Sequence, residues 1–537
     1  MEFTVDGRPV EIPDDGASLM EVLRDRLGIS SVKDGCSPQG QCGCCTVWVD
    51  GQPRVSCVTP ARRVAGRVIT TLDGLSSEIR DAWSGAFCAA GASQCGFCTP
   101  GIIMRLSGLE TRAGGEQSRS KAASALAAHL CRCTGWQTIL EAWEAYGTAD
   151  CGERDLVVAA RSGERDLVAA ADCGERDLVA AAHRAEIEGG WPQAVGSAVA
   201  LGEGGFAADT APAGALVALP DGRGGWALGE TMVEARAGAG KVQGRRTPVE
   251  SPMPLTFPEG DWAVRLRTSW VDPAYLETDA SWCEPGGEPA TPLANGGAFG
   301  GKLMSPLPEV ARRLANESGR PVRVLWSRED SVRHGPKRPP VAIGMNPERR
   351  GVIRVARTPG VAGAITAVAP GLVVEEVDIA GPPTSVAIRG AGWVEALVAL
   401  SALDGGIQPV VAPGGGSARA EWGPEGLRIW VDCGDPLDEV VLRSYCIGAA
   451  HMAYSWVTSE SLTVDPTGEV HDLTMRSFGI VPASRMPPVE VEINPCDGPP
   501  VGCSDAVFAA VAAATWRAAG HPPDWPTGPL PDHFVSL

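Results

Sequence analysis

The cysteines are the residues of this sequence most able to carry out chemistry, because they are numerous and closely spaced. The chain has 17 cysteines, and ten of them lie before residue 134. Thiolates bind zinc and iron–sulfur clusters, and clustered cysteines in a reducing compartment more often hold metal than form disulfides. Eight of the ten fall into two compact sets, so the sequence predicts two metal centres in its first quarter.

The first cysteine set has the spacing C-x5-C-x2-C-x11-C. Its members are Cys36, Cys42, Cys45 and Cys57. The first gap is one residue longer than in the plant-type pattern, in which four thiolates hold a [2Fe-2S] cluster. Glycines in the same loop allow backbone N–H groups to turn toward the cluster. Cys44 is a fifth candidate, and we prefer Cys45 as the ligand because it preserves the two-residue gap.

The second cysteine set combines a C-x2-C pair with a later C-x-C pair. Its members are Cys95, Cys98, Cys131 and Cys133. Residues two apart point to different sides of a helix, so the later pair must lie on a turn or at a helix start. Residues 102–108 and 118–129, between the pairs, have helical patterns. Structural zinc and a disulfide framework are alternatives, but two adjacent sets without histidine at ligand spacing favour a second [2Fe-2S] cluster.

A small sheet must position the first set. Phe3–Val5 and Val10–Ile12 flank an Asp-Gly turn, which predicts a hairpin. Ser18 precedes a helical pattern over residues 19–27, as a capping residue does. A second hairpin, over residues 46–57, delivers the fourth cysteine ligand.

Three cysteine motifs together resemble a known family. They are Gly35–Thr46, Gln94–Gly101 and Cys131–Gly135, and they look like the iron–sulfur portion of the xanthine oxidase family of molybdenum hydroxylases. The resemblance implies a ferredoxin-like β-grasp domain, here residues 1–75, followed by a four-helix [2Fe-2S] domain, here residues 76–146. In that family the cluster of the helical domain lies nearer the molybdenum, and the cluster of the ferredoxin-like domain passes electrons onward.

A repeat occupies the linker predicted over residues 147–183. The hexapeptide Gly-Glu-Arg-Asp-Leu-Val starts at residues 152, 163 and 174, a period of 11 residues that is close to three helical turns. We interpret it as a partly helical linker without a catalytic role, in which Cys151 and Cys173 are not ligands. Members of the family with three cofactors place a flavin-binding stretch here, and no such stretch follows in this sequence.

The remaining chain reads as a reduced α+β molybdopterin-binding part. Residues 184–255 are expected to form a reduced first molybdenum subdomain, and residues 256–537 the molybdopterin-binding domain. A glycine-rich loop from Asn295 to Lys302 can serve as an ordinary tight turn or allow close approach of a flat cofactor. It resembles the family's molybdopterin-contacting loop, which assigns cofactor contacts to Gly296, Gly297, Ala298, Phe299, Gly300 and Gly301.

Arg389 is the other candidate cofactor contact. Residues 383–392 look like the arginine-bearing turn beside the metal site of the family, where a guanidinium can clamp an anion bidentately. The alternative is an ordinary surface arginine after a strand. Cys446 and His451 are five residues apart, off the i, i+4 ligand spacing, and are expected to be packing residues.

The sequence departs from the family where a catalytic glutamate is expected. The family carries a Gly-x-Gly-Glu motif whose glutamate acts as a base. Here Cys503 follows Gly502 in place of the glutamate. Asp505 is either a substitute base or the N-cap of a helix over residues 506–519. The molybdopterin-binding part is also much shorter than in the family.

Composition narrows the function classes. The chain has 65 acidic and 46 basic residues, a net charge of −19, which disfavours non-specific binding to nucleic acid or anionic membranes. No apolar run approaches the roughly 20 residues that span a bilayer, and the N-terminus lacks a signal-peptide pattern. We therefore expect a cytoplasmic protein.

The leading hypothesis is an oxidoreductase of the molybdenum hydroxylase type. It would hold two [2Fe-2S] clusters and molybdopterin, as such or as the cytosine dinucleotide. Electrons would pass from the molybdopterin site through the clusters to a separate FAD-binding subunit or another acceptor, in a hetero-oligomer. Purines, other N-heterocycles and aldehydes all remain open as substrates. The alternative is a non-hydroxylating electron-transfer subunit whose degenerate molybdopterin scaffold docks a partner, and a zinc-stabilised interaction protein is a more distant one.

Overall fold

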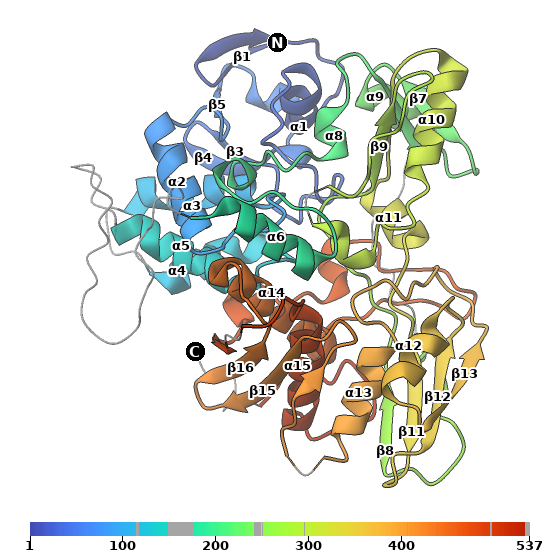
Figure 1. The fold of residues 1–537 in the computed structure, drawn as a ribbon. Coiled ribbons are helices and arrows are strands. Elements are labelled where there is room, and N and C mark those ends of the chain that lie inside the picture. Colours follow the sequence, from blue (N-terminus) through green and yellow to red (C-terminus); the bar gives the residue numbers. More distant parts are fainter. Residues whose placement is uncertain are drawn as a thin grey trace.

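The protein has a mixed α+β fold with several sheets, as the sequence predicts (Figure 1). The computed structural model describes residues 1–113, 118–148, 176–240, 249, 251–294, 296–404, 406–494 and 497–531. The first two repeat units, with Cys151 and Cys173, lie outside these residues, as does Asn295. Among the described helices, none combines the length and apolar character needed to cross a bilayer.

The N-terminal part is a five-stranded sheet with the order β2-β1-β5-β3-β4. Both predicted hairpins are confirmed, and β1 pairs in parallel with β5. The short helix α1 (Leu19–Glu21) begins with a capping box between Ser18 and Glu21 and continues as a π-helical turn over Val22–Arg26. The strands are β1 (Glu2–Val5), β2 (Arg8–Glu11), β3 (Thr46–Val49), β4 (Gln52–Val55) and β5 (Val68–Thr70).

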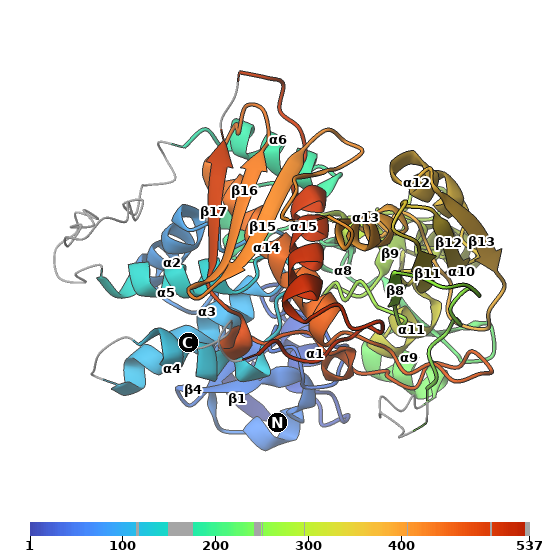
Figure 2. The same ribbon diagram turned by 90° about the horizontal axis from the view of Figure 1, so that it is seen from below.

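Four helices follow the sheet and pack beside it (Figure 2). Their apolar faces meet in a core in which the rings of Trp83 and Tyr146 stack with centroids 3.9 Å apart. The helical patterns predicted around residues 102–108 and 118–129 correspond to the second and third of these helices. They are α2 (Ser77–Ala89), α3 (Thr99–Ala113), α4 (Arg119–Ala125) and α5 (Gln137–Thr148).

The middle of the chain forms a four-stranded sheet of order β7-β6-β10-β9. Strand β6 pairs in parallel with β10, so residues 184–255 share one sheet with later strands. Its strands are β6 (Leu216–Pro220), β7 (Trp226–Gly229), β9 (Ala280–Cys283) and β10 (Val322–Leu325). The helices of this region are α6 (Leu178–Gly189), α7 (Ser197–Ala200), α8 (Ala207–Thr210), α9 (Met232–Ala239) and α10 (Leu307–Ser318).

Two further four-stranded sheets complete the fold, with the orders β13-β12-β11-β8 and β14-β15-β16-β17. Helix α15 lies centrally between the last sheet, α14 and α13 (Figure 2). The strands are β8 (Val264–Arg267), β11 (Val341–Met345), β12 (Gly351–Ala356), β13 (Leu372–Val377), β14 (Val410–Val411), β15 (Ser417–Gly423), β16 (Gly426–Asp432) and β17 (Val489–Asn494). The helices are α11 (Arg328–His334), α12 (Val361–Val368), α13 (Trp393–Ser401), α14 (Glu439–Thr458) and α15 (Ser504–Ala518).

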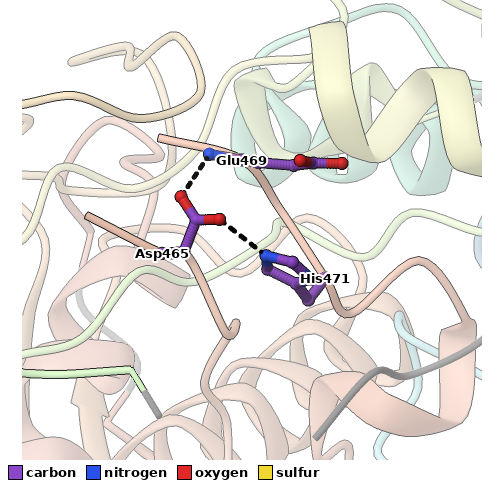
Figure 3. Close-up of side chains that lie close together, drawn as sticks. All are labelled: Asp465, Glu469 and His471. Carbon is purple, nitrogen blue, oxygen red and sulfur yellow. Dashed lines mark hydrogen bonds and ion pairs between the residues drawn. The ribbon is translucent and has the colours of Figure 1, made fainter. Parts of the chain in front are cut away.

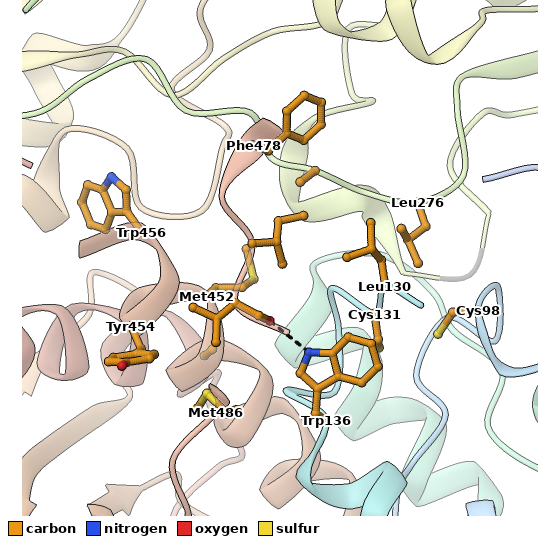
Figure 4. Packing of buried hydrophobic residues seen from close by; sticks show 14 of the residues in the cluster. Cys98, Leu130, Cys131, Trp136, Leu276, Met452, Tyr454, Trp456, Phe478 and Met486 are labelled. Carbon is orange, nitrogen blue, oxygen red and sulfur yellow. Dashed lines mark hydrogen bonds between the residues drawn. The ribbon is translucent and has the colours of Figure 1, made fainter. Parts of the chain in front are cut away.

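The N-terminal and C-terminal parts share one continuous apolar core. Figure 4 shows Trp136 among residues of both parts, and its indole Nε1 donates a hydrogen bond to the carbonyl oxygen of Val481 at 3.2 Å. Arg132, which lies between two cysteines of the second set, forms a bidentate ion pair with Glu460 at 2.6 and 2.8 Å. Both side chains are at most 4% exposed, so this pair links the two parts in a nearly dry environment.

Replacing Glu460 with alanine is expected to destabilise the protein by about 3–5 kcal/mol, because it leaves the Arg132 charge buried and unpaired. The free energy of unfolding from urea titrations measures this loss. The control Glu490→Ala removes an exposed ion pair with Arg428 and should cost no more than about 1 kcal/mol. Equal losses of unfolding free energy in the two variants would show that the buried ion pair contributes no more to stability than the exposed one.

Candidate cluster and cofactor sites

The four thiols predicted as the first ligand set converge in the structure. Cys36 lies within hydrogen-bonding reach of Cys42 and Cys57, and Cys57 within reach of Cys45. All four residues are at most 5% exposed. Hydrogen bonds from Cys42 and Cys57 hold the pKa of the Cys36 thiol well below its usual value. A quartet of buried, converging thiols is a donor set that suits a [2Fe-2S] cluster, which supplies one-electron redox chemistry when bound.

Backbone N–H groups also point at this set, as predicted from the glycines of the loop that carries Cys36, Cys42 and Cys45. The amides of Gln39 and Gln41 donate to Cys36 Sγ at 3.1 and 3.4 Å. The amide of Cys57 donates to Cys45 Sγ at 3.5 Å. Such N–H···S contacts stabilise negative charge on sulfur and tune the potential of a bound cluster.

Cys44 lies next to this quartet. It contacts Cys42, and its charge interacts with Cys36 and Cys45 as well as with Cys131 of the second set. A Cβ atom on Gly101, near the start of α3, would lie 2.8 Å from the Cys44 Cα atom, so this helix packs directly on Cys44. Cys44 is therefore close to both sets, whereas Cys45 lies beside Cys57.

The second thiol set also converges, as two pairs. Cys133 Sγ lies 3.5 Å from Cys95 Sγ, and Cys98 lies within hydrogen-bonding reach of Cys131. The hydrogen bond with Cys98, aided by Thr134, lowers the pKa of the Cys131 thiol to about 7. Among the cysteines that the structure describes, none forms a disulfide, so the disulfide alternative finds no support there.

A cavity of about 250 Å³ adjoins the second set. Cys95 and Cys133 line it together with Arg389, Asp505 and part of the glycine-rich loop. The lining loop residues are Gly296, Gly297, Phe299 and Gly300. The structure thus brings most of the predicted cofactor contacts to the second cysteine set, whereas Ala298 and Gly301 do not line the cavity.

The glycine-rich loop has a backbone that only small residues permit. Gly300 has φ +84°, and a Cβ atom there would lie 1.9 Å from the carbonyl oxygen of Ala387. Ala298 and Phe299 have φ of 50° and 54°, which non-glycine residues rarely adopt. A wall made largely of glycine backbone, with the Phe299 ring beside it, fits the flat ring system of a pterin. The cavity volume is slightly below the roughly 300–1,000 Å³ typical of ligand pockets.

Arg389 is buried beside this cavity, so the alternative of a surface arginine is wrong. Its residue is 8% exposed, and its guanidinium donates to Ser504 Oγ at 3.2 Å. Its Nε atom lies 3.1 Å from Asp505 Oδ1, and the guanidinium stands 5.4 Å from the centroid of the Phe299 ring. This cation can hold an anionic or carbonyl group in the cavity.

The predicted N-cap role of Asp505 is wrong. Helix α15 has Cys503 at its N-cap position without a side-chain cap, and Asp505 lies in the first turn. Its side chain, 44% exposed, pairs with Arg389 instead. Cys503, which replaces the family's glutamate, donates its thiol to the carbonyl oxygen of Asp432 at 3.2 Å, and burial raises its pKa. The thiol therefore points toward β16 and does not line the cavity.

Glu188 is the site residue that sequence reasoning missed. It lies near the end of α6, lines the cavity, and accepts hydrogen bonds from the amides of Cys503 and Ser504 at 3.1 and 2.8 Å. Arg184 pairs with it at 3.1 Å, and both side chains are fully buried. The i, i+4 arginine–glutamate spacing was the only sequence signal for this pair. The carboxylate at the start of α15 thus comes from α6, which is a different element from the one that carries the family motif.

His451 and Cys446 are packing residues, as predicted. Both are fully buried in α14, and His451 Nε2 lies 2.8 Å from the carbonyl oxygen of Val481. Burial lowers the pKa of His451 to about 4. The ring is therefore neutral near pH 7, which suits a core position.

A separate group of possible metal-binding side chains lies in the turn after α14 (Figure 3). One ligand atom from each of Asp465, Glu469 and His471 lies within 4.8 Å of the others. Asp465 Oδ2 lies 2.8 Å from His471 Nε2, and Oδ1 accepts from the backbone of Thr467 and Glu469. The Thr467 hydroxyl, which donates to Oδ1 at 2.6 Å, and the His471 ring hold the pKa of Asp465 well below its usual value, and these bonds account for the group as a hydrogen-bonded turn.

At the level of sequence, the similarity to known proteins lies in the cysteine-rich part of the chain. Residues 71–144 match the family described as a [2Fe-2S] binding domain. The chain is 38% identical over 149 residues to the xanthine dehydrogenase iron-sulfur-binding subunit of Escherichia coli O157:H7, which is 26% of this chain and 89% of that subunit. It is 35% identical over 165 residues to the xanthine dehydrogenase of Blastobotrys adeninivorans, of which it covers only 12%.

A solved structure matches the fold of nearly the whole chain. The aldehyde oxidoreductase from Desulfovibrio gigas superimposes with a TM-score of 0.68 over 98% of this chain and 99% of that one. The sequence identity is 15%, so this likeness concerns the fold. It extends the similarity past the cysteine-rich part into the three later sheets.

Replacing Cys45 with alanine is expected to remove about two iron atoms per chain, because it takes one thiolate from the first set. Iron analysis and the visible absorption of anaerobically purified protein measure this loss. Cys44→Ala is the matched control one residue away and should keep the full iron content. The reverse pattern would make Cys44 the ligand.

Proposed function

The chain belongs to the xanthine oxidase family of molybdenum hydroxylases, and on that premise we propose that it is an oxidoreductase with two [2Fe-2S] centres and a molybdopterin site. A separate flavin subunit or another protein would accept its electrons, and the setting would be the cytoplasm. The first cysteine set would hold one cluster through Cys36, Cys42, Cys45 and Cys57. The second set would hold the other through Cys95, Cys98, Cys131 and Cys133.

The shared cavity is the observation that carries this proposal. Two thiols of the second set, Cys95 and Cys133, line the same cavity as the glycine-rich loop and Arg389. A group bound there would touch the second centre directly. The second set in turn adjoins the first, because the amide of Leu130 donates to the carbonyl oxygen of Cys42 at 3.0 Å. The cavity therefore adjoins the second cysteine set, and the second set adjoins the first.

The residues around the cavity have separable tasks. When bound, a molybdenum–pterin group would supply the two-electron oxidation that the protein side chains lack. Arg389 would orient an anionic or carbonyl group, since its guanidinium is buried and directed by Asp505 and Ser504. Asp505 is the carboxylate best placed to take up a proton, because it lines the cavity and reaches solvent. Glu188 is held by Arg184 and two amides, so it fixes the start of α15.

A second candidate function is an electron-transfer subunit that performs no hydroxylation. Its support is the direction of Cys503, whose thiol points toward β16 where the family carries a glutamate base. The small cavity also favours it. In this reading the molybdopterin scaffold would serve only to dock a partner.

Metal and pterin analysis separates the candidates. The proposed oxidoreductase predicts about four iron atoms and one molybdenum atom per chain, together with a fluorescent pterin after oxidation. Four iron atoms without molybdenum or pterin would favour the electron-transfer subunit. Zinc in place of iron would contradict both.

Replacing Gly300 with alanine is expected to abolish molybdenum and pterin retention while iron stays at the wild-type level. The new Cβ atom would collide with Ala387 at the wall of the cavity. Gly214→Ala is the control, because Gly214 also has positive φ, +76°, but has nothing within 4 Å of the added atom. Equal cofactor contents in both variants would disprove the role of the loop.

A further inference from the structure

An arginine-rich groove runs along the N-terminal sheet, on a protein that is otherwise strongly acidic. Its volume is about 730 Å³, and Arg54, Arg63, Arg67 and Arg105 line it together with His129. No aspartate or glutamate occurs among the described residues that line it. The whole chain carries a net charge of −19, so this basic surface is opposite in sign to the net charge of the protein. We call it the arginine groove.

The arginines of the groove are largely available for an external partner. Arg54 and Arg63 are exposed, and within the described part of the chain neither forms an ion pair. Arg67 has only a long contact of 3.8 Å with Asp50, and both side chains are about half exposed. Such a contact contributes little to stability. Arg105 donates to the carbonyl oxygen of Ala125 at 3.0 Å. No ion pair among the described residues uses the charges of Arg54 and Arg63, which indicates a role in recognition.

The groove also reaches the first cysteine set. Thr46, which follows Cys45, and Val55 and Val58, which flank Cys57, all line it. Val58 is 53% exposed, and a Cβ atom on Gly40, in the cysteine-bearing loop, would lie 3.1 Å from its side chain. A single layer of residues therefore separates the groove from two ligand positions. An exposed apolar side chain ringed by arginines is the composition of a small docking surface.

We propose that the arginine groove docks an acidic electron-carrier protein, which takes one electron per encounter from the centre at the first cysteine set. The electron leaves the reduced centre, the carrier is reduced by one electron, and no bond or proton changes. The groove serves this purpose only if the first set holds a redox centre, as proposed above. Carboxylates around the carrier's redox group would pair with the arginines, while its apolar contact would cover Val58. Opposite charges would speed association and set the orientation of the complex.

The test compares charge-reversed variants of the full chain. Arg54→Glu/Arg63→Glu is expected to weaken binding of an acidic c-type cytochrome at least about tenfold at low salt. Arg8→Glu/Arg223→Glu has the same change in net charge at exposed sites outside the groove, and Arg8 lies on β2 at the opposite edge of the N-terminal sheet. This control should change binding by no more than about threefold. Calorimetry measures binding without requiring turnover.

Electron transfer gives an independent readout. Stopped-flow absorbance follows the dithionite-reduced protein as it reduces the acidic cytochrome, and the rate should fall in the groove variant and at high salt. Reoxidation by a small neutral quinone should be the same in all variants, because it needs no docking. A colourless preparation would refute the redox centres, whereas intact quinone reactivity with unchanged cytochrome binding would refute only the groove. Preference for a basic cytochrome c, or equally tight binding of a DNA duplex, would also overturn the proposal.

Discussion

Four thiols packed into one dry site repel one another as soon as they ionise, and this constraint governs the N-terminal quarter of the protein. Both sets consist of buried or half-buried cysteines whose sulfur atoms lie within contact range. Without a cation the thiols hold their protons unevenly, since the pKa of Cys36 is lowered while that of Cys57 is raised. Binding of metal by these thiols, as proposed above, would remove this conflict by exchanging protons for a metal charge.

Later parts of the chain pack directly against the backbone of the loops that carry the second cysteine set. A Cβ atom on Gly448, within α14, would lie 1.7 Å from the carbonyl oxygen of Cys133. On the other side, a Cβ atom on Gly96 would lie 2.3 Å from the carbonyl oxygen of Val199, which belongs to α7. Both cysteine loops are therefore held between helices that come later in the chain. The two parts therefore share one core around the second cysteine set.

Local sequence patterns were sufficient to predict several helices and strands. They were not sufficient to predict which residues far along the chain contact them. The hairpins and the Ser18 cap follow from short-range propensity and turn chemistry, and all are present. The convergence of Cys45 with Cys57 followed from spacing, because one short hairpin joins them. The N-cap role predicted for Asp505 is wrong because its carboxylate pairs with Arg389, a residue more than 100 positions earlier in the chain. The pairing of β6 with β10 likewise depends on packing across the middle of the chain.

The start of α15 is occupied by a carboxylate from another helix. The first amides of a helix carry partial positive charge and attract an anion. In this protein Glu188 already satisfies the amides of Cys503 and Ser504, and Arg184 balances its charge. An external anion therefore cannot use the N-terminus of α15, and Arg389 is the cation left to receive one in the cavity. Because Arg389 is itself paired with Asp505, a bound group must compete with that carboxylate.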